Sequence, residues 1–173
     1  MNPTIIAIVL SLTTISFVTA QNAQPITPAI NTANYDMAIG LRGGGTSGLT
    51  IKKFTSANQS WEAIIGGFPG GISATLLKEF YAPAGATGLT WYYGYGGHAV
   101  VGGGKRVYDK GGDVFFVRQV GFGIGVDGIV GLEYKIIPIP FAINFDLKPF
   151  VEVNTNGAAI VAFDPGLGIK FTF

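Results

Sequence analysis

The chain has 173 residues, a formal net charge of +1 and no cysteine. Such a length is typical of one domain, the near-neutral charge argues against nucleic-acid binding, and the lack of cysteine excludes disulfides, thiolate catalysis, cysteine zinc sites and a lipidated N-terminal cysteine. Charged residues are only 12% of the chain, about half the usual share, and glycine occupies 27 positions, which suits strands with lipid on one side and a crowded interior on the other.

Residues 1–20 have the features of a cleaved secretory signal. Residues 5–12 form a short apolar core, and residues 18–20 are small enough to precede a cut before Gln21. The first four residues depart from the usual pattern because they carry no lysine or arginine. A retained membrane anchor is the alternative, but serine and threonine interrupt the run, which is shorter than the roughly 20 apolar residues that a spanning helix needs.

Residues 21–34 contain Pro25, Pro28 and no charged side chain. They are expected to form an extended or disordered lead-in on the periplasmic side. From Tyr35 onward, runs with apolar side chains at alternate positions are separated by clusters of Gly, Pro, Asn and Ser, the pattern of strands joined by turns. The expected strands are 35–42, 49–54, 61–67, 72–81, 89–101, 119–136, 141–153 and 158–173.

Each expected strand has one apolar face and one small or polar face. In the last strand, Phe163 and Leu167 lie on the apolar face, and Asp164 and Lys170 lie on the other. The run 72–81 is ambiguous because both of its faces carry a leucine.

These eight runs predict an all-β fold, an eight-stranded antiparallel up-and-down transmembrane β-barrel over residues 35–173. The backbone N–H and C=O groups of an unpaired strand edge find no hydrogen-bond partners in lipid, so the last strand should pair with the first. An even number of strands places both chain ends on one side, the periplasm. The turns expected at that side are 55–60, 82–88 and 137–140. The turns expected at the outer side are 43–48, 68–71, 102–118 and 154–157.

Aromatic residues recur at the expected periplasmic ends of the strands. Amphipathic rings prefer the membrane interface, so these residues are expected to form a girdle at one level. The expected girdle consists of Tyr35, Phe54, Trp61, Phe80, Tyr81, Trp91, Tyr134, Phe141 and Phe173.

The inward faces mix glycines with acidic and basic side chains in comparable numbers. An eight-stranded barrel is just wide enough to be filled by side chains, and buried charges without partners are costly. We therefore expect a hydrogen-bonded ladder of charges that plugs the bore, without a wide aqueous pore. The expected members are Asp36, Arg42, Lys52, Glu62, His98, Asp127, Glu133, Lys135, Asp146, Lys148, Glu152, Asp164 and Lys170.

Three features of residues 35–173 carry a resemblance to a known family: the terminal Phe173, the run 131–135 before a proline-containing turn, and the run 148–150. With these features the chain resembles small outer-membrane barrels of the OmpA, OmpX and opacity-protein type, including short barrels of Bacteroidetes-like bacteria. The resemblance implies a structural or adhesive envelope role, contact with outer-membrane lipids and lipopolysaccharide, and Phe171 and Phe173 as a signal to the barrel assembly machinery. A monomer is favoured.

No residue pattern indicates catalysis, a cofactor or a metal. His98 is the single histidine and is expected to bind a carboxylate in the bore, because a catalytic base needs a nearby nucleophile. Glu62 and Glu133 are expected to meet Lys52 or Lys135 and not to act as paired acid and base. The glycines before Lys105 lack the spacing and the Ser or Thr of a phosphate-binding loop, and those of 121–125 are expected to relieve crowding.

The long connection 102–118 is the one place where a partner could be recognised. The candidates for contact with lipopolysaccharide phosphates are Lys105, Arg106, Lys110 and Arg118. Phe115 and Phe116 are candidates for contact with the outer leaflet or a protein. The alternative is a solvated loop without a ligand.

Two alternatives to an envelope role stay open at this point. The same scaffold could be a narrow passive channel or a lipid-modifying enzyme of the outer membrane. A soluble, lipocalin-like barrel is the third interpretation, and it requires apolar residues inside and charges outside.

Overall fold

The computed structural model describes residues 35–68, 70–102, 105–110, 113–118, 121–155, 157 and 159–173. The expected signal, 1–20, and the expected lead-in, 21–34, lie outside these residues. Across the described part of the chain, no helix has the length and apolar character needed to cross a membrane.

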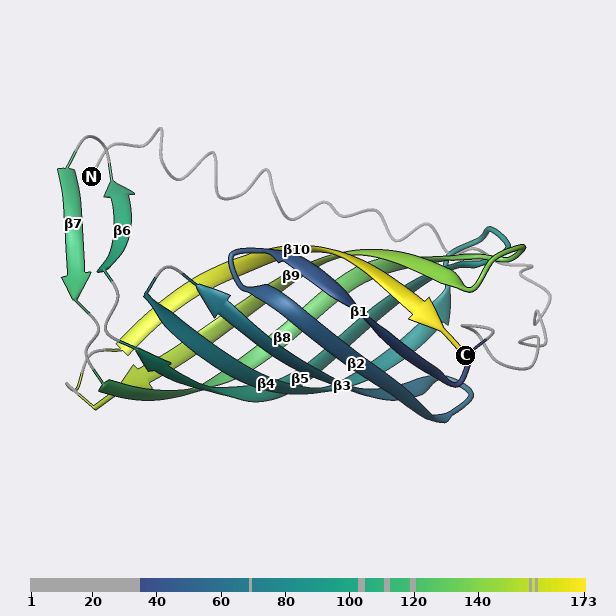
Figure 1. The fold of residues 1–173 in the computed structure, drawn as a ribbon, viewed down its shortest axis with the longest axis horizontal. Coiled ribbons are helices and arrows are strands. Elements are labelled where there is room, and N and C mark those ends of the chain that lie inside the picture. The colour runs from purple at the N-terminus through teal and green to yellow at the C-terminus, as the bar shows by residue number, and fades with distance from the viewer. Residues whose placement is uncertain are drawn as a thin grey trace, which may run out of the picture.

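Eight strands form one closed antiparallel barrel, which confirms the expected fold (Figure 1). Strands adjacent around the barrel follow each other in the chain, except that a hairpin intervenes between β5 and β8. The barrel strands are β1 (Met37–Gly44), β2 (Ser47–Ser56), β3 (Gln59–Phe68), β4 (Gly71–Pro83), β5 (Leu89–Gly102), β8 (Gly121–Ile136), β9 (Phe141–Asn154) and β10 (Ala159–Thr172).

The barrel closes by antiparallel pairing of β1 with β10. The register runs from Ala38 opposite Thr172 to Gly44 opposite Gly166. Beyond the ladder, the Phe173 carbonyl oxygen accepts hydrogen bonds from the amides of Asp36 and Met37, each at 3.0 Å. Closure therefore leaves neither strand with an open edge, and it brings residues 35 and 173 to the same end of the barrel.

The connection between β5 and β8 contains a structure that the sequence reasoning missed. Two further strands, β6 (Lys105–Lys110) and β7 (Asp113–Arg118), pair with each other as a separate two-stranded sheet. Figure 1 shows this hairpin beyond the barrel end opposite the C-terminus. The expected loop 102–118 is thus corrected to a hairpin, and the Gly111-Gly112 pair between its strands was the available turn signal.

Two turns are also tighter than expected. The turn expected at 55–60 consists of Ala57 and Asn58, and the turn expected at 43–48 consists of Gly45 and Thr46. Glycines and polar residues at these strand ends had suggested longer loops. The β2–β3 ladder continues to Ser56 opposite Gln59, whereas the β1–β2 ladder ends at Arg42 opposite Gly48 and the Gly44 amide donates to the Ser47 hydroxyl at 3.1 Å.

Side chains alternate strictly between the outer wall and the bore. On β8, Val130 and Leu132 are each 48% exposed, whereas Asp127 and Glu133 are 4% and 1% exposed. The ambiguous strand β4 follows the same rule, with Leu76 outside and Leu77 inside. The interior of this protein therefore combines many polar and charged side chains with a smaller cluster of buried aromatic and aliphatic ones, and most of its large apolar residues face outward.

Candidate functional site

The bore is lined by buried charged and polar side chains contributed by all eight barrel strands. Seven buried carboxyl groups and five buried lysine or arginine side chains lie there together with His98. The acidic set is Glu62, Glu79, Asp127, Glu133, Asp146, Glu152 and Asp164. The basic set is Arg42, Lys52, Lys135, Lys148 and Lys170.

Lys52 is the centre of a first cluster, in the half of the bore nearer the C-terminus. Its Nζ lies 2.8 Å from Glu62, 3.0 Å from Glu79 and 3.2 Å from Glu133. Lys170 adds a second cation, 3.0 Å from Glu62 and 3.5 Å from Glu133. These five side chains come from β2, β3, β4, β8 and β10, so the cluster ties together strands from all around the barrel.

Aromatic side chains pack around this cluster. Tyr35 lies edge-on to Phe54 with ring centroids 5.2 Å apart, Phe54 contacts Tyr81 at 5.0 Å, and Tyr81 stacks on Tyr92 at 5.1 Å. The Tyr35 hydroxyl donates to Glu133 at 2.6 Å, and the Tyr81 hydroxyl donates to Glu79 at 3.0 Å. The rings thus fill volume while their hydroxyls satisfy carboxylates, as buried tyrosines require.

A second series of ion pairs continues toward the other end of the bore. Arg42 lies 2.6 Å from Asp146 and 3.1 Å from Asp164. Lys148 lies 3.4 Å from Asp164 and 3.2 Å from Asp127. Each cation therefore bridges two carboxylates, which offsets part of the cost of burying them.

His98 ends this series. Its Nδ1 lies 2.9 Å from Asp127, and its Nε2 lies 3.2 Å from Glu152. The Phe150 ring packs edge-on against the imidazole at 5.4 Å. Both ring nitrogens therefore face carboxylates, which leaves neither available to activate a nucleophile.

A small cavity lies beside His98 in the bore. It is also lined by Thr75, Lys148, Phe150 and Glu152, and its volume is about 20 Å³. A cavity needs roughly 10–15 Å³ to hold one water molecule. This space therefore has room for about one water molecule and not for an organic substrate.

Inward glycines make room for the largest buried side chains. A Cβ at Gly166 would lie 2.3 Å from the Arg42 guanidinium, and one at Gly125 would lie 2.3 Å from His98. Both distances are far below van der Waals contact. The run 121–125, expected to relieve crowding, does so at Gly125.

The structure places all but one of the sequence-predicted bore residues inside the barrel. The exception is Asp36, which is exposed. Asp36 precedes the β1 ladder, and the amides of Asp36 and Met37 both donate to the Phe173 carbonyl oxygen. The alternation of inward and outward side chains is interrupted there, so Tyr35 points into the bore and Asp36 does not. Lys135 is buried, but its amino group donates to the carbonyl oxygens of Ile136 and Ile139, at 3.1 and 2.8 Å, in the adjoining turn.

The expected aromatic girdle divides between two environments. Tyr35, Phe54 and Tyr81 are buried inside the bore, which corrects their assignment to the outer wall. Phe54 and Tyr81 lie two residues beyond the inward Lys52 and Glu79, so strand alternation itself places them inside. The members that remain exposed on the outside are Trp61, Trp91, Tyr134, Phe141 and Phe173.

Glu79 is the bore residue that sequence reasoning missed. It is fully buried, accepts a hydrogen bond from Ser60 at 2.9 Å and pairs with Lys52. The available signal was strand alternation. Ser73 and Thr75 lie on the same face of β4 as Glu79, an even number of residues away, and are also buried. Exchanging the expected Asp36 for Glu79 leaves the expected numbers of acidic and basic side chains unchanged.

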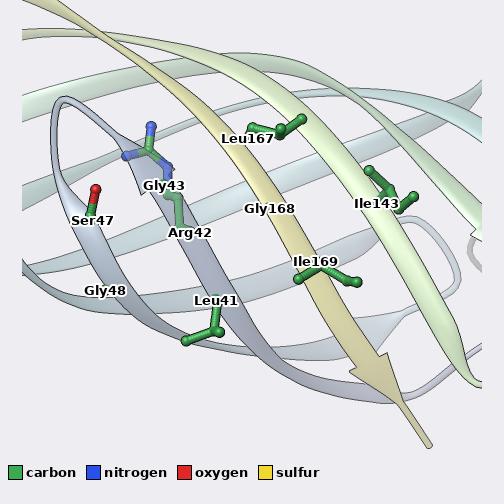
Figure 2. A pocket seen from close by; sticks show the side chains of 9 residues that line it. All are labelled: Leu41, Arg42, Gly43, Ser47, Gly48, Ile143, Leu167, Gly168 and Ile169. Carbon is green, nitrogen blue, oxygen red and sulfur yellow. The ribbon is translucent and has the colours of Figure 1, made fainter.

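The outer wall is apolar over most of its area. Figure 2 shows Leu41, Ile143, Leu167 and Ile169 around a shallow depression on it, where β1, β9 and β10 run side by side. The expected assembly-signal residues also belong to this wall, with the Phe171 and Phe173 rings edge-on at 5.3 Å. Within the described residues, no group of three or more His, Asp or Glu side chains could hold a metal ion.

The residues proposed for surface contact lie on the hairpin. Lys105, Arg106 and Lys110 belong to β6, and Phe115 and Phe116 belong to β7. In the register, Tyr108 is opposite Phe115.

No protein-family model and no curated protein matches this chain. Solved structures with a similar fold include two outer-membrane barrels. The N-terminal β-barrel domain of Pseudomonas aeruginosa OprF is 14% identical, with 79% of this chain and 95% of that chain covered and a TM-score of 0.52. Neisserial surface protein A, NspA, is 11% identical, with 80% and 94% covered and a TM-score of 0.52. The chain therefore has the fold of small, OmpA-like outer-membrane barrels.

Proposed function

We propose that this barrel is an integral protein of the bacterial outer membrane, with its apolar wall against lipid and its bore sealed by ion pairs. In this proposal it has a structural or adhesive role in the cell envelope and no catalytic role. Its contacts are outer-membrane lipids and lipopolysaccharide, and it works as a monomer.

The observation that carries the proposal is the reversed distribution of side chains. Aliphatic and aromatic residues such as Ile65 and Phe163, 66% and 68% exposed, cover the outer wall, whereas Lys52 and Glu79 are fully buried. Soluble monomers rarely expose contiguous apolar patches larger than a few hundred Å². The same distribution counts against a lipocalin-like ligand binder, which keeps its apolar residues inside.

The connections between strands support a proposed orientation in the membrane. Residues 35 and 173 share one end with three short turns, and the β6–β7 hairpin leaves the other end. Outer-membrane barrels have short periplasmic turns and longer outer loops. We therefore place both chain ends in the periplasm and the hairpin outside, where Lys105, Arg106, Lys110, Phe115 and Phe116 are the candidate contacts. Phe171 and Phe173 remain the proposed contact for the assembly machinery.

Fractionation and gel mobility test the membrane assignment. The full chain, expressed in a Gram-negative host, is expected in the outer-membrane fraction and should migrate differently in SDS gels with and without boiling. Recovery in the soluble fraction, with a single mobility, would contradict the proposal.

A narrow passive channel is the second candidate function, because a continuous series of charged groups follows the bore. Planar-bilayer recordings separate it from a sealed barrel. We expect no stable conductance from the purified chain. Among the described residues, four of the five bore cations, all except Lys135, bridge two or more carboxylates, and the cavity beside His98 holds about one water molecule. Reproducible unitary currents would favour the channel.

A further inference from the structure

Two lysines stand apart from every other charged group of the barrel. Among the described residues of the eight barrel strands, Lys53 and Lys78 are the only charged side chains at outward-facing positions. Charged residues on the lipid face destabilise a barrel near the membrane midplane and are tolerated near its interfaces. Lys53 lies three residues before the last residue of β2, and Lys78 lies five residues before the last residue of β4. Both are therefore near the barrel end at which residues 35 and 173 lie.

Both lysines flank the same tryptophan. In the ladders, Lys53 is directly opposite Trp61 on β3, and Trp61 is directly opposite Lys78 on β4. The Lys78 amino group lies 5.3 Å from the centroid of the Trp61 ring and donates to the Thr55 hydroxyl at 3.2 Å. Adjacent strands are about 4.8 Å apart, so the backbones of the two lysines are separated by about 10 Å, which their long side chains can span.

An aromatic wall adjoins this pair. Phe80 lies 5.5 Å from Tyr93 and 6.2 Å from Tyr95, and Trp91 lies 5.6 Å from Tyr93, measured between ring centroids. Lys78 also lies 6.0 Å from the Phe80 centroid. We call Lys53, Trp61, Lys78 and these rings the basic-aromatic patch.

The patch has an uncompensated positive charge. No carboxylate of the described residues forms an ion pair with Lys53 or Lys78, whereas each lysine in the ion-pair series of the bore has at least two. The exposed Asp36 lies just outside the β1–β2 ladder, one residue before the Met37–Lys53 pair, and its carbonyl oxygen accepts from the Phe54 amide at 2.8 Å. One lysine over the Trp61 ring and a second lysine on the adjacent strand fit a ligand with an anionic head and an apolar body.

We propose that the basic-aromatic patch binds an anionic phospholipid, with the phosphate between the Lys53 and Lys78 amino groups and the acyl chains along the aromatic wall. This inference rests on the proposed membrane insertion and places the lipid in the periplasmic leaflet. The two lysines attract the head group electrostatically, so binding weakens as ionic strength rises. The rings provide the amphipathic contact typical of interfacial tryptophan and tyrosine.

Fluorescence quenching tests the site on the full chain. The chain has two tryptophans, so Trp91→Phe leaves Trp61 as the only reporter. The protein is placed in phosphatidylcholine vesicles that contain brominated phosphatidylglycerol or, at the same fraction, brominated phosphatidylcholine. Brominated acyl chains quench a tryptophan that they touch, so the two lipids compare anionic with zwitterionic head groups at Trp61.

The expected result is stronger quenching by the anionic lipid. Each basic residue near a membrane surface contributes about 1 kcal/mol, so local enrichment should be about fivefold per lysine. Lys53→Gln with Lys78→Gln should lower quenching to the zwitterionic level, and Lys53→Arg with Lys78→Arg should keep it.

Two contrary outcomes have different meanings. Equal quenching by both lipids in the Trp91→Phe protein overturns the lipid site but leaves membrane insertion intact, even if the glutamine variant does not fold. Absence of quenching by either lipid, in protein bound to the vesicles, overturns membrane insertion itself, because the outer wall then does not face acyl chains.

Discussion

Lys52 and Lys53 are consecutive residues of β2 with opposite environments, and they make a matched pair for mutation. Lys52 is fully buried against Glu62, Glu79 and Glu133, whereas Lys53 points outward. Removing one partner of a buried ion pair typically costs about 3–5 kcal/mol, because the remaining charge is left without compensation. Lys52→Met should therefore lower the free energy of unfolding by about that amount.

The measurement is urea unfolding in neutral phosphatidylcholine vesicles, followed by tryptophan fluorescence. Lys53→Met is the control and should change the free energy of unfolding by less than about 1 kcal/mol, as expected outside a buried network. Similar losses in the two variants would show that the Lys52 cluster does not stabilise the bore.

Two glycines of the barrel wall make a second matched pair for mutation, because only one of them lies against a buried side chain. Gly166 leaves room for the Arg42 guanidinium, which Asp146 and Asp164 hold in place, whereas a Cβ at Gly43 would meet nothing closer than 3.9 Å. Gly166→Ala should destabilise the barrel by about 1–3 kcal/mol through overpacking, and Gly43→Ala should have little effect. Urea midpoints of the two variants check this, and equal midpoints would contradict the crowding argument.

Strand alternation predicted most residue environments correctly, and its failures are instructive. Strict alternation along the strands would have placed Phe54, Tyr81 and Glu79 in the bore. The two aromatic residues were instead assigned to the outer girdle because of their residue type. Alternation could not place Tyr35 and Asp36, because both precede the β1 ladder, which begins at Met37. There the amides of Asp36 and Met37 both donate to the Phe173 carbonyl oxygen. The specific pairing of Lys52 with three glutamates depends on barrel register, which the sequence pattern does not contain.

At the scale of elements, the β6–β7 hairpin should be dispensable for the barrel. The two strands pair with each other in a sheet separate from the barrel, and Gly102 lies directly opposite Gly121 in the β5–β8 ladder. Residues 103–120 can therefore be replaced by a two-residue Asn-Gly turn, the favoured hairpin connection.

The shortened protein should keep its gel-mobility shift on boiling, and its urea midpoint should stay close to that of the full chain. Loss of the mobility shift, or a markedly lower midpoint, would show that the hairpin helps to hold β5 against β8.

The eight barrel strands were predictable because each has one face in contact with the bore and one face without a protein partner, so their side chains alternate along the whole length. The hairpin was not predicted, since its six-residue strands mix charged and apolar residues without a clean period of two. At the turn of Ala57 and Asn58, the strand before it was expected to end two residues too early and the strand after it to begin two residues too late, because polar residues near a turn do not show where the ladder stops.

At the scale of the whole molecule, stability depends on which environment the outer wall meets. The described bore holds seven carboxyl groups and five basic side chains, and this ionic core replaces the apolar core of a soluble domain. Those buried charges are tolerated only where they pair in a closed barrel, and an apolar wall of this extent is expected to be covered by lipid. In the proposed function, fold and membrane insertion are therefore coupled.

Val130 on β8, 48% exposed, tests this claim most directly. The chain has no cysteine, so a spin label attached to Val130→Cys reports one site, and a label at the turn residue Ala57→Cys is the water-exposed control. In vesicles, the Val130 label should collide frequently with oxygen, which dissolves in lipid, and rarely with a water-soluble nickel chelate, whereas the Ala57 label should show the reverse. Frequent collisions of the Val130 label with the nickel chelate, and rare ones with oxygen, would contradict the account.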